Sequence, residues 1–284
     1  MIRKARDGLP ARVYRSWTRE KLVYLEKYAT AFMKAMAPKR QQGKWDRLVY
    51  LDLLSGPGRG IDAETGEEFD GSPLLALRVE PPFDGLFLSD LRSKNIEALR
   101  RRIPASDSSR IDLRVGDCNA VAKEVVNHLS PRTLGLAFVD PEGFEAKFEL
   151  FRALAGRRID VLFFFPGGIG IARNLRAFVR QTDSPMDGLW GGREWREQPL
   201  AKLAAGKRPT REEERKLDHS WVQGFRNKMR RIGFAHQDQS DPGFTNEKSV
   251  LMYHLLFFSQ DPAGLKIWQG IKRIEPSGQR TLPL

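Results

Sequence analysis

Apolar positions along the chain first recur at helical spacing and then gather into short runs. Between residues 14 and 37 they return every three or four positions, which predicts an amphipathic helix that ends at Pro38. After a polar link, residues 48–54 form a run of mostly branched apolar side chains. Such a run predicts a strand buried on both faces, as in a parallel sheet. A glycine-rich turn, Gly56 to Gly60, follows it directly.

The alternation of apolar runs and helical spacing then becomes regular. Runs predict strands at 87–90, 111–115, 134–140 and 161–165, and helical patterns lie between successive strands. Strands separated by single helices imply right-handed crossovers and therefore a parallel sheet.

One acidic insertion interrupts this pattern. Residues 61–71 carry five Asp or Glu side chains, so we expect either a lid over a site or a solvated surface loop. A helix is then predicted to restart at Ser72, which caps free amides, and Pro73, which suits a first turn.

The last part of the chain has a different pattern. Residues 170–232 are predicted to be helical, with a long helix from Thr210 whose basic cluster 228–231 is a candidate for phosphate contact. Residues 250–258 and 265–271 are predicted to be two strands joined by a tight connection, which favours an antiparallel pair.

These patterns together predict an α/β fold. A mostly parallel, seven-stranded sheet closed by an antiparallel terminal strand resembles the methyltransferase version of the Rossmann architecture. We expect a basic helical segment over residues 1–46, a core formed by residues 47–169 and 248–284, and a helical basic insertion over residues 170–247.

Composition narrows the class of protein. Hydrophobic residues make up 40% and charged residues 30% of the 284 positions, and no apolar run reaches the roughly 18 residues of a membrane span. Cys118 is the only cysteine, so an internal disulfide and a structural zinc site are excluded. With no secretory signal in the sequence, we expect a cytoplasmic protein with no membrane partner.

The net charge of +12 is unevenly distributed. Residues 1–49 carry +9, residues 50–165 carry −4 and residues 166–284 carry +7. Basic flanks around an acidic core favour a polyanion such as nucleic acid as partner. The alternative is that the arginine-rich composition only keeps the surface soluble.

The glycine-rich turn indicates which cofactor the core binds. It has the pattern G-x-G-x-G, is preceded by Asp52, and is separated from the next helix by the acidic insertion. A dinucleotide fingerprint needs a helix start aimed at the pyrophosphate, and an acid before the turn would repel that group. S-adenosylmethionine has a cationic amine and no phosphate. We therefore expect it to bind Asp52, Ser55, Gly56 and Gly58.

Three further acids follow later strands. Asp90 is expected to bind the ribose hydroxyls, Asp117 with the adjacent Cys118 the adenine, and Asp140 to face the transfer site. Any one of these acids is alternatively a helix N-cap, which aspartate also favours.

The segment Asp140-Pro141-Glu142-Gly143-Phe144 is the candidate catalytic motif. Enzymes that methylate exocyclic amines often have an acid or amide there, followed by prolines and an aromatic residue. Asp140 and Pro141 match the first half of that pattern, whereas Glu142 departs from it and Phe144 comes one place late. Asp140 is expected to hydrogen-bond the acceptor and Phe144 to stack on it; the alternative is a tight turn.

Several segments in order resemble the three-Cys-motif partner protein family. The resemblance implies a Rossmann-type methyltransferase core encoded near a cysteine-motif protein, which is then a possible partner. The matching segments are Lys21–Tyr28, Leu51–Gly58, Gly71–Leu74, Gly116-Asp117 with Asn119, Phe138–Phe144, Tyr253–Phe257 and Lys266–Trp268.

The sequence therefore favours an S-adenosylmethionine-dependent methyltransferase that acts on nucleic acid at a base amine. One alternative is a non-catalytic module of the same fold that binds nucleic acid or a partner protein. Another is a methyltransferase for a small molecule or a protein, towards which the acidic insertion points. A nicotinamide dehydrogenase is the least favoured, because of the turn chemistry.

Overall fold

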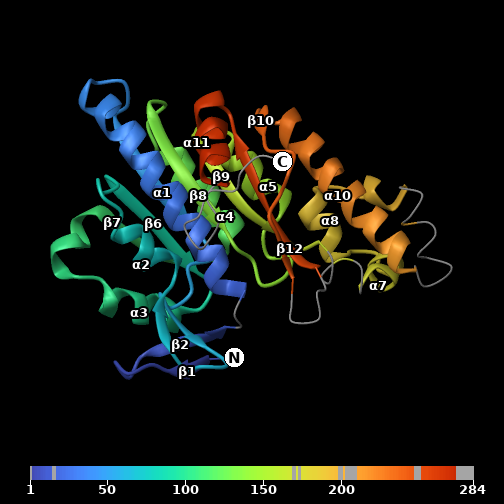
Figure 1. The fold of residues 1–284 in the computed structure, drawn as a ribbon, viewed down its shortest axis with the longest axis horizontal. Coiled ribbons are helices and arrows are strands. Elements are labelled where there is room, and N and C mark those ends of the chain that lie inside the picture. The colour runs from blue at the N-terminus through green and yellow to red at the C-terminus, as the bar shows by residue number, and fades with distance from the viewer. Residues whose placement is uncertain are drawn as a thin grey trace.

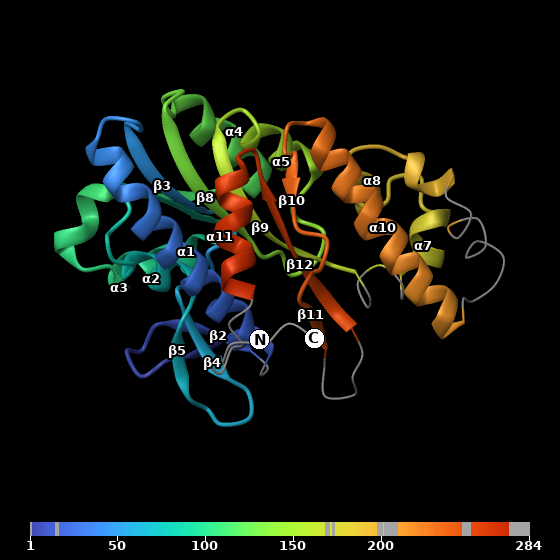
Figure 2. The same cartoon turned by 45° about the horizontal axis from the view of Figure 1, so that its top comes forward.

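One large twisted sheet runs through the protein, and helices cover both of its faces (Figure 1). The computed structural model describes residues 2–14, 17–167, 174–197, 210–245 and 251–272, with the single positions 171 and 201. A second, smaller sheet near the N-terminus lies below one end of the large one in Figure 2.

The large sheet is mostly parallel. Its path is β10-β12-β9-β8-β3-β6-β7, and β11 pairs with β12 off this path. Only β12 runs antiparallel to its neighbours β9, β10 and β11. Numbered in chain order without β11, the strands lie in the order 3-2-1-4-5-7-6, which confirms the predicted fold class. The bounds are β3 Arg47–Asp52, β6 Gly85–Asp90, β7 Ile111–Val115, β8 Thr133–Val139, β9 Arg158–Phe165, β10 His236–Gln237, β11 Gly243–Thr245 and β12 Leu251–Ser259.

An apolar layer covers each face of the sheet, so its central strands are buried on both faces. On one face α1, α2, α3 and α11 contribute to a core with Tyr50, Leu136 and Phe164. On the other face α4, α5, α8 and α10 pack against Leu51, Phe163 and neighbouring residues. The bounds are α1 Trp17–Gln41, α2 Ser72–Leu77, α3 Ser93–Arg102, α4 Cys118–His128, α5 Phe148–Leu154, α7 Leu175–Arg180, α8 Pro185–Trp190, α10 Arg211–Arg231 and α11 Pro262–Lys272, with short 3-10 turns at Ala105–Arg110 and Glu194–Glu197.

The strand predicted at residues 265–271 is wrong. These residues lie in α11, and the antiparallel partners of β12 are β9, β10 and β11. Trp268 and Ile271 are buried, and α11 packs against α1. Their spacing of three fits a helix face, and Pro262 at the start suits a first helical turn.

The first helix also differs from expectation. It begins at Trp17 and continues through Pro38 to Gln41. A proline removes one donor, but its fixed φ is helical, so the helix passes through it near its end. Residues 1–46 are not all helical either, because β1 Ile2–Lys4 and β2 Pro10–Tyr14 precede the helix as an antiparallel pair.

The acidic insertion is not a loop along its whole length. It forms the hairpin of β4 Arg59–Asp62 and β5 Glu68–Asp70, and β4 pairs in parallel with β2. The small sheet thus has the order β1-β2-β4-β5. The helix that follows is capped by Gly71, so the expected capping role of Ser72 is wrong.

Of the predicted insertion 170–247, residues 170, 172–173, 198–200, 202–209 and 246–247 lie outside the described residues, and the others contribute to the same sheet and core as the rest of the chain. The long helix predicted from Thr210 is α10, and Thr210 is its N-cap in a capping box with Glu213. Trp221 and Phe225 on α10 belong to the same apolar cluster as Phe163, while β10 and β11 join the large sheet. Of the predicted strand at 250–258, residue 250 lies outside the described residues.

Candidate functional site

The glycine turn after β3 is fixed in a conformation that only small residues tolerate. Gly56 and Gly58 have φ of +60° and +79°. A Cβ at Gly58 would lie 2.7 Å from Leu99 Cδ1, whereas a Cβ at Gly56 would project into open space. Ser55 anchors the turn, since its backbone N and its hydroxyl both donate to the Ser89 carbonyl, at 2.9 Å and 3.0 Å. The turn is therefore a preformed cradle with one open side.

Asp52 is buried at the end of β3, directly before this turn. It accepts long hydrogen bonds from the Tyr50 hydroxyl at 3.3 Å and from the Leu54 backbone N at 3.4 Å. Burial raises the pKa of Asp52 from 3.8 to about 7; the Ser72 hydroxyl opposes this rise and the charge of Asp140 adds to it. A carboxylate in this position gains stability when a cation approaches it.

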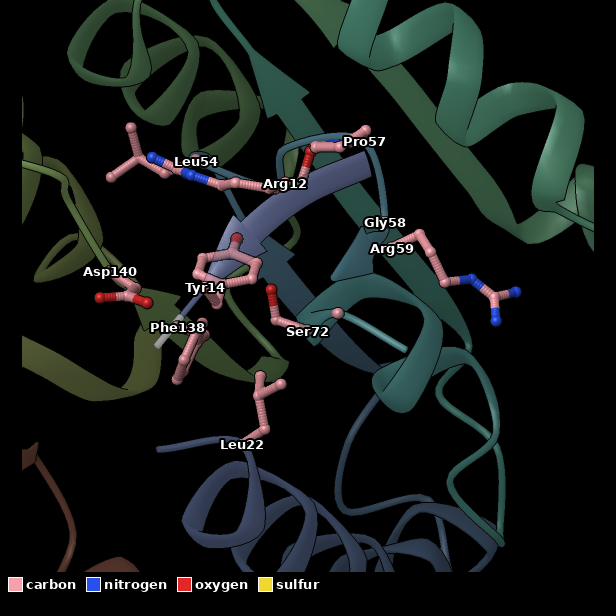
Figure 3. Close-up of a pocket in the computed structure, with 12 residues that line it drawn as sticks. Arg12, Tyr14, Leu22, Leu54, Pro57, Gly58, Arg59, Ser72, Phe138 and Asp140 are labelled. Atoms are coloured by element: carbon pink, nitrogen blue, oxygen red, sulfur yellow. The ribbon is translucent and has the colours of Figure 1, made fainter. Parts of the chain in front are cut away.

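A narrow cavity lies beside the turn (Figure 3). It holds about 20 Å³, room for one water molecule. Its lining comes from β2, α1, the glycine turn, the start of α2 and the end of β8. Asp52 is not among the residues that line this cavity. The lining residues are Arg12, Tyr14, Leu22, Leu54, Ser55, Pro57, Gly58, Arg59, Gly71, Ser72, Phe138 and Asp140.

Asp140 follows β8 and lines the cavity, as Figure 3 shows. Its Oδ1 accepts a hydrogen bond from Lys21 Nζ at 2.8 Å, across 119 positions of sequence. The Lys21 side chain is 7% exposed and the Asp140 side chain 24%. The structure thus places a buried ammonium at the predicted transfer residue.

Asp90 connects the turn to the next strand. Its Oδ2 accepts from the Gly56 backbone N at 3.1 Å, and its Oδ1 accepts from Arg92 N and Asn95 Nδ2. The neighbouring Leu91 is 71% exposed, and Val115 at the end of the adjacent strand β7 is 56% exposed. Two exposed apolar side chains beside an acid suit a flat, partly apolar ring.

Asp117 and Cys118 begin α4. Asp117 is its N-cap and accepts from the backbone N of Asn119 and of Ala120, at 3.0 Å and 3.2 Å. The Cys118 side chain is buried and its Sγ lies 3.5 Å from the Glu145 carbonyl. Of this pair, only Asp117 is exposed at the sheet edge.

The other side chains of the candidate catalytic motif contact different parts of the protein. Pro141 is buried, and Glu142 forms an ion pair with Arg12 of β2. The Phe144 ring packs edge-to-face on Phe178, with centroids 5.1 Å apart, as part of the apolar cluster on that face. Among the described contacts, Phe144 thus meets the core and not the cavity.

A histidine–aspartate pair lies at the same edge of the sheet. His254 Nε2 on β12 is 2.5 Å from Asp218 Oδ2 on α10, and both side chains are mostly buried. His254 is paired with Phe165 at the end of β9. This pair ties α10 to the sheet.

The sequence interpretation gave no role to Lys21, Arg12, Tyr14, Leu91 or Val115. Lys21 carried one signal, since it lies four and seven positions before the core residues Leu25 and Tyr28 on the buried face of α1. The others became visible only once the small sheet and the strand ends were placed.

Two features are absent from the described residues. They contain no group of three or more His, Cys, Asp or Glu side chains arranged to hold a metal ion. None of their helices is long and apolar enough to span a membrane.

Comparison with known proteins finds similar folds. Protein LPL1258 from Legionella pneumophila (DUF519) is 14% identical, with a TM-score of 0.48, over 92% of this chain and 95% of that chain. A putative O-methyltransferase from Klebsiella pneumoniae is 13% identical over 85% and 89%, with a TM-score of 0.38. A putative S-adenosylmethionine dependent methyltransferase from Listeria monocytogenes is 9% identical over 76% and 92%, with a TM-score of 0.38.

No family model and no curated protein matches the chain. The resemblance to the three-Cys-motif partner family therefore stays a prediction. The strand order 3-2-1-4-5-7-6, with its one antiparallel strand, is itself the methyltransferase-like Rossmann fold.

Proposed function

We propose that this protein is an S-adenosylmethionine-dependent methyltransferase that acts on nucleic acid at a base amine. The observation that supports this most is the placement of Asp52, Asp90 and Asp140 around the glycine turn at the carboxyl edge of the sheet. In open α/β sheets this edge is where ligands bind.

The chain's residues suit the parts of this cofactor. The open side of Gly56 leaves room for its approach, and the buried Asp52 favours a cationic group without phosphate. Asp90 is suited to accept hydrogen bonds from the ribose hydroxyls. The exposed side chains of Leu91 and Val115 are suited to apolar contact with the adenine ring. When bound, the cofactor supplies an electrophilic methyl group; Asp140 would hold the acceptor towards it.

The nucleic-acid acceptor rests on charge near the cavity. Arg12 and Arg59 line the cavity, and Arg59 also lines a neighbouring cleft with Arg78, Arg102 and Arg110. Arg78 is 69% exposed, while Arg102 is committed to Asp7 and to backbone carbonyls. Arg78 also pairs with Asp70, so a phosphate would bind it in competition with that carboxylate.

Calorimetry with S-adenosylmethionine and its demethylated product tests the cofactor. We expect micromolar binding that falls about tenfold in Asp90→Ala, since Gly56 and the ribose lose one carboxylate. Asp112→Ala is the matched control, an acid on β7 paired with Arg114. Absence of binding by the wild type would overturn the proposal. The acceptor is tested by methyl transfer from labelled cofactor to total RNA and DNA of a strain that lacks the protein.

The water-sized cavity favours a second candidate, a non-catalytic module of the same fold that binds nucleic acid. Arg12 and Tyr14 close the space that the cofactor would use. This candidate predicts salt-dependent RNA or DNA binding without any cofactor binding.

A further inference from the structure

Lys21 is a buried cation for which the fold alone gives no reason. It lies on the apolar face of α1, one residue before Leu22, and only 5% of its surface is exposed. Burying a lysine has a desolvation penalty that an apolar side chain at the same position avoids. An ordinary contact between α1 and the sheet would therefore not require this residue.

The surroundings of Lys21 fix its ammonium group tightly. Nζ donates to Asp140 Oδ1 at 2.8 Å and lies 4.4 Å from the ring centroids of both Phe164 and Tyr253. Both rings present electron-rich faces that favour a cation. The ammonium is thus held by one carboxylate and two aromatic rings, from β8, β9 and β12.

This arrangement controls the geometry of Asp140. One carboxylate oxygen is fixed by Lys21, while the carboxylate also lines the cavity. Burial raises the pKa of Asp52, Tyr14 and Tyr50, and the charge of Asp140 adds to each rise. The side chain therefore lies among the residues of the candidate transfer site.

We propose that Lys21 is a positioning residue that orients Asp140, so that its second oxygen accepts a hydrogen bond from an N–H donor on the methyl acceptor. The proposal rests on the proposed function and narrows the acceptor class. A carboxylate in a salt bridge accepts hydrogen bonds and does not donate them. It therefore selects an acceptor atom that carries hydrogen, such as the base amine of the proposed function, over a carbonyl or a ring nitrogen without hydrogen.

The transfer step has a simple balance. The nitrogen lone pair forms the new bond to the methyl carbon as the carbon–sulfur bond breaks and leaves its electron pair on sulfur, and the nitrogen then loses one proton to water. Asp140 faces the positive charge that develops on nitrogen, and Lys21 keeps the carboxylate oriented during this change.

Cofactor analogues test the geometry without a methyl acceptor. Sinefungin carries an amine where the cofactor carries its methyl group, while S-adenosylhomocysteine carries neither. In Lys21→Met, Asp140 loses its competing cation, so we expect the sinefungin affinity to rise about tenfold relative to S-adenosylhomocysteine. The same substitution in an Asp140→Asn background should leave the ratio unchanged.

Two control variants keep this test interpretable. Lys34→Met makes the same change at an exposed position of α1, and it should leave both affinities at the wild-type value. Lys21→Arg retains the charge and serves if Lys21→Met melts at a much lower temperature; we expect a near wild-type affinity ratio but slower transfer. An unchanged ratio in folded Lys21→Met would overturn the inference while the proposed function stands.

The activity readout separates positioning from packing. With total RNA or DNA as acceptor, Lys21→Met should lower kcat about 100-fold and leave the cofactor Kd within threefold. Alkylating the thiol of Lys21→Cys with bromoethylamine in the unfolded protein rebuilds an ammonium, and refolding should restore most of the rate. Because positions 21 and 118 are both buried in the folded protein, this variant is made in a Cys118→Ala background. Wild-type binding of neither analogue would instead refute the proposed function itself.

Discussion

Two buried carboxylates near opposite edges of the sheet differ in their hydrogen bonds and in the charges near them. Asp160, near the start of β9, accepts a 2.6 Å hydrogen bond from the Tyr28 hydroxyl. Asp52, at the end of β3, has hydrogen bonds of 3.3 Å and 3.4 Å and lies near the charge of Asp140. Burial raises the pKa of both acids, to about 6 for Asp160 and about 7 for Asp52.

The difference lies in what encloses each acid. At the amino edge, α11 approaches so closely that a Cβ on Gly264 would lie 2.8 Å from the Asp160 carboxylate. At the carboxyl edge, the glycine turn leaves open space and acids face a cavity. The amino edge is thus built for packing, and the carboxyl edge retains charge that a cationic ligand would compensate.

The largest expected effect separates the two acids by pH. A folded-state pKa above the ordinary 3.8 stabilises the protein at low pH, and this stability is lost as pH rises through the folded-state pKa. Between pH 5 and pH 8 the loss amounts to about 3 kcal/mol for Asp52 and about 1 kcal/mol for Asp160. Urea unfolding at pH 5 and 8 should therefore show a weaker pH dependence in Asp52→Asn and, to a smaller extent, in Asp160→Asn.

A saturating cofactor sharpens this first test. If its ammonium compensates Asp52, the wild-type protein should gain more stability from S-adenosylhomocysteine at pH 8 than at pH 6. The stability that Asp52→Asn gains from S-adenosylhomocysteine should be the same at both pH values. Asp160→Asn should gain more at pH 8 than at pH 6, as the wild type does. Equal gains at both pH values in the wild type would show that Asp52 only supports the turn.

A matched pair of glycines gives the next largest effect. Gly58→Ala places a Cβ 2.7 Å from Leu99 at a φ of +79°, so we expect the turn to distort and cofactor affinity to fall about 100-fold. Gly264→Ala places one 2.6 Å from Ser259 Oγ, which should lower the free energy of unfolding by about 2 kcal/mol. Calorimetry and urea unfolding of both variants check this. If Gly264→Ala weakened cofactor binding as much as Gly58→Ala, the assignment of binding to the carboxyl edge and packing to the amino edge would be wrong.

The sequence was informative where structure depends on local pattern. The strands β3, β6, β7, β8 and β9 of the large sheet followed from apolar runs, because strands inside a parallel sheet need such residues. The carboxyl-edge positions of Asp52, Asp90 and Asp140 followed from the parallel crossovers.

It was less informative where partners are distant. Residues 265–271 are apolar enough for a strand, and the helix that they form instead packs against α1, which is distant in the sequence. The insertion became the hairpin β4–β5 because β2 pairs with it from more than 40 positions away. Lys21 meets Asp140 across 119 positions, so its role could not be recognised from either segment alone.

Exposed apolar residues provide a third and smaller test of the carboxyl edge. Leu91→Ser should weaken cofactor binding about fivefold, since adenine burial would lose about 1 kcal/mol of apolar contact, and should not change stability. Val115→Ser should act similarly. The control is Ile2→Ser in the small sheet, which is 46% exposed and lies away from the strand ends. Calorimetry decides, and equal effects at all three positions would contradict an adenine site.

The smallest effect concerns ion pairs on the two edges. Arg12 and Glu142 bridge β2 to the motif after β8, beside the cavity that the cofactor would enter. Such a pair contributes under about 1 kcal/mol, so Arg12→Ala should speed cofactor association only about threefold. At the amino edge, Arg132 pairs with Asp46 at 3.0 Å. These two residues directly precede β8 and β3, so their ion pair links the starts of two neighbouring strands.

Stopped-flow fluorescence distinguishes the two pairs. Arg132→Ala should leave the association rate unchanged, because its ion pair lies at the edge without the glycine turn. High salt should speed association in the wild type and not in Arg12→Ala, since screening opens the same contact. A wild-type rate that is slow and insensitive to both changes would mean that β2 is held by Arg102, whose guanidinium binds Asp7 and the carbonyls of Pro10 and Pro57.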